Sequence, residues 1–182
     1  MNEIADRYRR LAERFTRVVD AVPDGSWSAA SPCEGWTARQ VLEHVIESEH
    51  GFLARFDRAP VTEEDAGVTD RWSAVREAVQ ASLDDPDVAG TTYEGHFGET
   101  TLAETVDGFF SPDLVVHAWD IARAAGLEDL EPMPDDEVAR IDTRLRAMGD
   151  AIRSPGAFGP EVAVPDDAPA QHRLLGFLGR RP

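Results

Sequence analysis

The sequence predicts an all-α protein, built as a bundle of four long helices with shorter helices added. In the long segments, apolar residues recur every three or four positions, as they do on one face of a helix. Residues that typically cap or stop a helix lie at the ends of these segments. Residues 88–99, rich in glycine and threonine, predict one short extended segment, which is too short to imply a sheet of any size.

The first two long helices are expected at residues 2–20 and 37–58. The first ends before the turn sequence Pro23-Asp24-Gly25. In the second, Thr37 and Gln40 have the spacing of a capping box, and Pro60 cannot continue the helix. Between the two helices lies a loop, residues 22–35, which we expect to be packed down because Trp27 lies in it and Trp36 beside it.

The next helix is expected at residues 70–83, with Asp70 as its cap, and a longer one at residues 100–126, ending at a C′ glycine. Pro112 interrupts the longer helix. Either Ser111 caps a new helix there, or one long helix is kinked at Pro112. The helical spacing of apolar residues upstream favours the kinked helix.

Two more helices are expected, at residues 135–152 and 171–178, with a stretch rich in proline and glycine between them. No repeat or interdomain linker separates the chain into folding units. We therefore expect a single domain, residues 1–182, with a short C-terminal extension.

Composition excludes several classes of function. The net charge of −17 opposes binding to nucleic acid or to an anionic membrane surface. The 18 basic residues are all arginine, which excludes a P-loop and Schiff-base chemistry. One cysteine, no apolar signal segment and no long apolar run predict a cytoplasmic protein without membrane spans.

One helical stretch carries the residues most suited to chemistry. Asp113 and His117 lie four residues apart on one helix face, and Asp120 lies one turn further. Since the rest of that helix is almost entirely apolar, these groups should be buried and therefore paired or bound to a metal. His44, with Glu47 one turn on, lies near the middle of the helix at 37–58.

If these two helices are neighbours, His44, Asp113 and His117 form a 2-His-1-carboxylate metal site with free coordination positions. The alternative is that both histidines are hydrogen-bonded core residues, with His117 paired to Asp113 or Asp120. Spacing alone favours this alternative. Cys33 is expected to be a small buried apolar residue rather than a nucleophile.

Four separated segments resemble the DinB-like, mycothiol-dependent maleylpyruvate isomerase family of actinobacterial metal-binding proteins. They are the stretches from Ser31 to Thr37, from Val41 to Ile46, from Asp113 to Gly126 and from Arg173 to Arg180. The resemblance implies a DinB-like four-helix bundle with one divalent metal, zinc or nickel, held by His44, Asp113 and His117. Asp113 stands where the family is expected to have the longer glutamate. The mycothiol-dependent isomerase itself is expected to be a larger protein with a second, C-terminal domain. The thiol-binding groups of that enzyme therefore cannot be assigned to residues of this chain.

The resemblance favours a metal-dependent transferase or isomerase that uses mycothiol, with a small-molecule thiol and an electrophilic substrate as partners. A metal-assisted hydrolase, with Glu47 or Asp120 as general base, is the second hypothesis. A non-catalytic bundle that binds a metal or ligand is the third. A homodimer is compatible with the resemblance, because DinB-like bundles commonly pair through helix faces.

Overall fold

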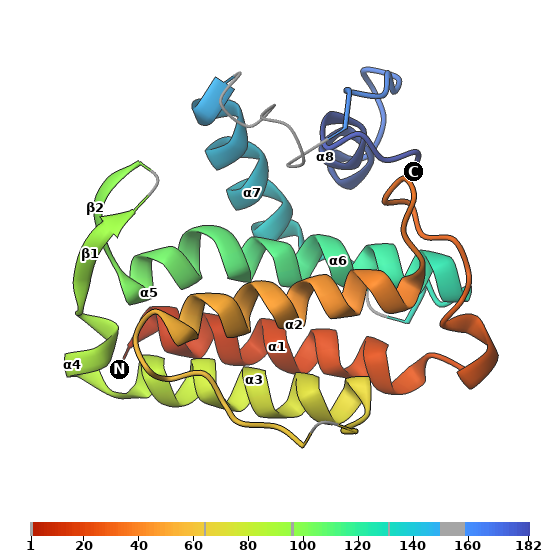
Figure 1. Ribbon diagram of the computed structural model, residues 1–182. Coiled ribbons are helices and arrows are strands. Elements are labelled where there is room, and N and C mark those ends of the chain that lie inside the picture. The colour runs from red at the N-terminus through yellow and green to blue at the C-terminus, as the bar shows by residue number, and fades with distance from the viewer. Residues whose placement is uncertain (1, 64, 96, 131, 150–158) are drawn as a thin grey trace.

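Four helices pack side by side and form the core of an all-α bundle in the computed structural model, which confirms the predicted fold class (Figure 1). The structure describes residues 2–63, 65–95, 97–130, 132–149 and 159–182. The bundle helices are α1 (Glu3–Ala21), α2 (Ala38–Ala54), α3 (Val68–Asp84) and α6 (Ser111–Ala125). Their apolar faces meet in one cluster of buried residues, as an amphipathic helix requires.

Helix α1 begins after its cap, Asn2, whose side chain also donates a hydrogen bond to the carbonyl of Leu83 at the far end of α3. The side chains of Tyr8 and Phe15 are fully buried, and the Phe15 ring lies 4.7 Å from that of Trp72 on α3. After α1 the chain forms a single 3₁₀ turn, η1 (Asp24–Ser26). Trp27 then packs into the core, as expected for this loop, whereas Trp36 is exposed.

Helix α2 has the predicted capping box between Thr37 and Gln40. Its predicted end near residue 58 is wrong, because regular α-helix stops at Ala54. Asp57 adopts a left-handed backbone conformation with φ of 57°, and the next amide, of Arg58, bonds back to the carbonyl of Leu53. This turn ends the helix before Pro60 can do so.

Helix α3 begins two residues before the predicted Asp70, after Gly67, so Asp70 is not its cap. Asp85 instead caps a further short helix, α4 (Pro86–Ala89), which the sequence interpretation missed. The predicted extended segment is a two-stranded antiparallel hairpin, in which β1 (Thr92–Gly95) pairs with β2 (Gly98–Thr101).

The helical backbone continues through Pro112 without a break, but the turn before the proline is wider than in a regular α-helix. Short helix α5 (Leu102–Thr105) leads into a π-helical segment, η2 (Val106–Phe110), and then into α6. Ser111 itself has helical backbone angles, with φ of −60° and ψ of −46°, so the alternative in which Ser111 caps a new helix is wrong. Because Pro112 has no N–H for the carbonyl four residues earlier, the regular α pattern breaks here, and Ser111 bonds five residues back to Val106.

The last two helices lie together on one side of the bundle (Figure 1). They are α7 (Asp135–Met148) and α8 (Ala170–Phe177), and the predicted helical residues 150–152 lie outside the described part of the chain. Arg7 of α1 joins α7 to the bundle, because its buried guanidinium binds the carboxylates of Glu137 and Asp107. Among the described residues, no helix is both long enough and apolar enough to cross a membrane.

Candidate metal centre

Helices α2 and α6 pack against each other and bring the three predicted ligands together. One ligand atom each of His44, Asp113 and His117 lies within 4.8 Å of the other two. The imidazole rings of His44 and His117 meet edge to face, with centroids 5.3 Å apart. Two imidazoles and one carboxylate therefore converge on one point between the helices, in an arrangement that can hold a divalent cation.

The three side chains differ in burial. His117 is buried, whereas His44 and Asp113 are half-buried, so the cluster is open on one side. Burial lowers the pKa of His44, and the nearby His117 lowers it further. A neutral imidazole is the form that binds a metal, so the surroundings of His44 favour the ligand form.

Asp120 fixes the orientation of the His117 ring. Its Oδ2 lies 2.9 Å from Nδ1 of His117, one helical turn away, and the Asp120 side chain is fully buried. This contact uses Nδ1 and leaves Nε2 for a second partner. A carboxylate on the far ring nitrogen is the usual support of a metal-binding histidine, because it sets the tautomer and the ring orientation.

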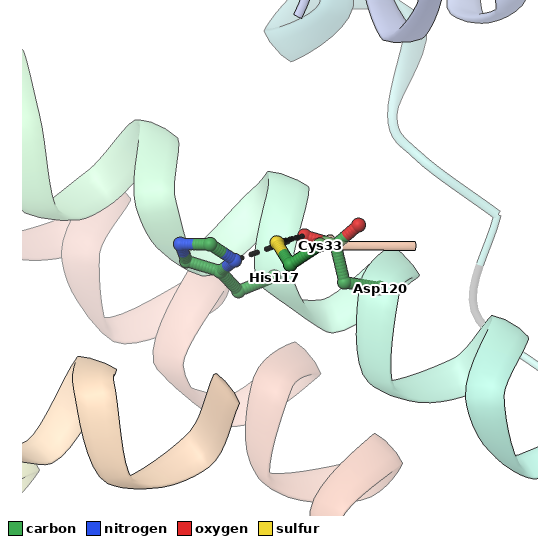
Figure 2. A group of neighbouring side chains, drawn as sticks. All are labelled: Cys33, His117 and Asp120. Atoms are coloured by element: carbon green, nitrogen blue, oxygen red, sulfur yellow. Dashed lines mark hydrogen bonds and ion pairs between the residues drawn. The ribbon is translucent and has the colours of Figure 1, made fainter. Parts of the chain in front are cut away.

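A second cluster meets at the same oxygen of Asp120 that contacts His117, and Figure 2 shows Cys33, His117 and Asp120 gathered there. Cys33 Sγ lies 3.2 Å from Oδ2 of Asp120, and Nη2 of Arg180 lies 2.9 Å from the same oxygen and 3.0 Å from Cys33 Sγ. Burial alone would raise the pKa of Asp120, but the hydrogen bonds and charges of His117 and Arg180 lower it to about 2. Burial alone would lower the pKa of His117, but Asp120, Cys33 and Asp113 together raise it to about 10. The Asp120 carboxylate thus lies against both the His117 ring and the Arg180 guanidinium, which favour its charged form.

The group of Cys33, His117 and Asp120 also has a spacing that could hold a cation. Arg180, however, already places its guanidinium against both Cys33 and Asp120. A divalent ion there would face that fixed positive charge at close range. The group of His44, Asp113 and His117 is consequently the better candidate for a metal.

The loop before α2 carries Cys33 and Trp36 to the site. Its backbone is tied by bonds from Ser31 N–H to the carbonyl of Trp36 and from Trp36 N–H to the carbonyl of Cys33. The exposed Trp36 ring lies 4.9 Å from the ring of His44. Trp36 thus stands at the open side of the cluster, where it can contact a bound molecule.

The two predicted general bases have different surroundings. Asp120 is fully buried and engaged by three donors, which suits it to holding His117 rather than to taking a proton from a substrate. Glu47 is exposed, and its charge raises the pKa of His44. Glu47 also lines a pocket of about 240 Å³ between α2, α3 and the segment that joins them, together with His50 and Arg71.

Sequence reasoning missed the roles of Cys33, Arg180 and Glu49. Cys33 packs against the apolar core, as expected, but it is only half-buried, and its Sγ also contacts Asp120 and Arg180. Both Cys33 and Arg180 belong to the segments that resemble the isomerase family. This resemblance is the feature of the sequence that could have pointed to them. Glu49 is buried on α2, five residues after His44, and no spacing marked it.

The fold and the site define a class: an all-α bundle with a histidine and carboxylate cluster between two of its core helices. A family model described as the mycothiol maleylpyruvate isomerase N-terminal domain matches residues 8–175. The chain belongs to this family, which confirms the resemblance seen in the sequence. Membership implies a mycothiol-related function of the isomerase or transferase type.

Two curated relatives come from Mycobacterium tuberculosis. The uncharacterized protein Rv0738 of strain H37Rv is 27% identical over 179 residues, which cover 95% of each chain. The uncharacterized protein MT0763 of strain CDC 1551 matches with the same identity and coverage. No solved structure gives a significant match to this chain.

Proposed function

We propose that this protein is a divalent-metal-dependent transferase or isomerase that uses mycothiol as its thiol. The convergence of His44, Asp113 and His117 is the observation that carries the proposal. Family membership supports the thiol, since the family takes its description from a mycothiol-dependent isomerase.

The donor set suits the proposed metal. Two imidazoles and a carboxylate are ligands of zinc and nickel, and three protein ligands leave at least one coordination position open. His44 and Asp113 are only half-buried, so a small molecule can reach that position from the side of Trp36. When bound, such a metal lowers the pKa of a thiol and makes a thiolate available at neutral pH.

The residues of the chain have distinct roles in this proposal. Asp113 contributes the only negative charge among the three ligands, and Asp120 holds the His117 ring in place through Nδ1. Trp36 offers an apolar face to the thiol or to its electrophilic partner. Glu47, exposed and one turn from His44, is proposed to accept or return a proton during the reaction.

Metal analysis and a thiol-dependent assay test the proposal together. After expression with added zinc and nickel, we expect about one metal ion per wild-type chain. In the His117→Ala variant we expect the bound metal to fall below a tenth of that value. The absence of bound metal from the wild-type protein would refute the proposal. Turnover of electrophiles without any thiol would instead favour a metal-assisted hydrolase.

A further inference from the structure

We infer that Arg180, in the turn after α8, is a positioning residue of the metal centre and acts on His117 through Asp120. This inference rests on the proposed function, because it concerns the support of one proposed ligand. Arg180 lies 63 positions after His117 and does not touch the three ligand side chains by any contact that the structure records.

The contact between Arg180 and Asp120 is made at two points. Nε of Arg180 lies 3.2 Å from Oδ1 and Nη2 lies 2.9 Å from Oδ2, and both side chains are buried. A guanidinium that binds both oxygens fixes the plane of the carboxylate as well as its position. Because Oδ2 of that carboxylate also contacts Nδ1 of His117, the plane fixed by Arg180 sets the direction of the imidazole ring.

The turn after α8 holds Arg180 in this position. Gly179 has a left-handed φ of 83°, and the amide of Arg180 bonds back to the carbonyl of Leu175, as in a Schellman C-cap. A side chain at Gly179 would lie 3.0 Å from the carbonyl of Pro160. The Arg180 guanidinium itself donates to the carbonyl of Leu178. The arginine is therefore already oriented when the protein has folded.

Arg180 is the arginine that pairs with this fully buried carboxylate among the ion pairs of the described residues. A carboxylate that supports the far ring nitrogen of a metal-binding histidine must itself be held in place. The ion pair with Arg180 and the contact with Nδ1 of His117 meet at the same oxygen, Oδ2 of Asp120.

The test is the affinity of the full chain for Zn²⁺, measured by competition with a chromogenic chelator. Arg180→Met keeps the bulk of the side chain and removes its charge, and we expect it to bind Zn²⁺ about 10- to 100-fold more weakly than the wild type. Arg181→Met makes the same change at the exposed neighbouring arginine and should leave the affinity unchanged. Arg180→Lys restores a charge without the two-point contact and should lie between the two.

A double-variant cycle separates positioning from general structure. Because Arg180 acts through Asp120, Arg180→Met should weaken Zn²⁺ binding far less in an Asp120→Asn background than in the wild type. A folded Arg180→Met protein with unchanged affinity would overturn the inference. Losses that simply multiply in the double variant would also overturn it.

A metal-free measurement keeps the inference distinct from the proposed function. The ¹⁵N resonances of the His117 ring report its contact with Asp120 without any metal. We expect Arg180→Met to shift these resonances and Arg181→Met to leave them in place. If the wild type binds no Zn²⁺, the proposed function fails, but unchanged His117 resonances in Arg180→Met are what would refute the role of Arg180.

Discussion

Glu49 should make the stability of the protein depend on pH. Its side chain is 1% exposed, Oε2 accepts a hydrogen bond of 2.9 Å from Tyr8, and Oε1 has no partner among the described residues. Burial raises the pKa of Glu49, the Tyr8 hydrogen bond lowers it and the charge of Asp113 raises it again, which leaves it at about 8. The folded protein therefore keeps a proton that the unfolded chain loses above its ordinary pKa of 4.5.

The size of the effect follows from that difference in pKa. The folded state binds the extra proton between pH 4.5 and about 8, so the free energy of unfolding falls as the pH rises through this range. One pKa unit corresponds to about 1.4 kcal/mol, so the protein loses about 5 kcal/mol of stability over the whole range. About 3 kcal/mol of this has already been lost at pH 7. Below pH 4.5 this contribution to stability is fully retained.

The variant Glu49→Gln removes the ionisation and keeps the shape. Its buried amide carries a constant cost of about 1–3 kcal/mol if it lacks a partner, so the slope with pH is the useful quantity. Relative to the wild type, the variant should gain about 1.4 kcal/mol of stability per pH unit between pH 5 and 8.

Urea unfolding at several pH values measures that slope. Glu13→Gln, at an exposed position of α1, serves as the matched control for the loss of one negative charge. Parallel stability curves for the wild type and Glu49→Gln between pH 5 and 8 would refute the reasoning.

Three further predictions concern other parts of the fold. Replacing Gly179 by alanine should lower the stability by about 1–2 kcal/mol in thermal unfolding, because a residue with a Cβ is strained at its left-handed φ. Arg7→Met should cost about 3–5 kcal/mol in urea unfolding, since it leaves the buried carboxylate of Glu137 without its main partner. Ni²⁺ should quench tryptophan fluorescence, and Trp36→Phe should remove most of this quenching, because the ring of Trp36 lies 4.9 Å from that of His44.

Each of these predictions has a contradicting result. An unchanged melting temperature for Gly179→Ala would mean that the turn before Arg180 is not strained by a side chain. A loss below 1 kcal/mol for Arg7→Met, on the scale of a surface ion pair, would mean that its network does not anchor α7. Equal quenching in the wild type and Trp36→Phe would place the nickel ion away from His44.

The bundle was predictable because its signals are local. Apolar spacing gives the helices, and the side chains of Thr37 and Gln40 give the start of α2. The π turn before α6 was not predictable, since it depends on how the helix compensates for the missing N–H of Pro112. The left-handed Asp57, which ends α2, likewise has no signature in the residues around it.

The candidate site was predictable only in part. The spacing of Asp113 and His117 places them on one face of one helix, but their meeting with His44 depends on the packing of α2 against α6. The residue pattern offered that meeting only on the condition that the two helices are neighbours, and the family resemblance favoured it. Arg180 and Cys33 are 147 positions apart, and their contact depends on the turn after α8. No periodicity encodes a contact of that kind.

Anomalous X-ray diffraction from crystals of the zinc-loaded protein tests the central proposal most directly. The proposal predicts one zinc peak, with His44, Asp113 and His117 each bound at about 2.0–2.2 Å, and with Asp120 still in contact with Nδ1 of His117. A zinc peak between Cys33 and Asp120, with Arg180 displaced, would contradict it, and so would the absence of any peak at the three ligands.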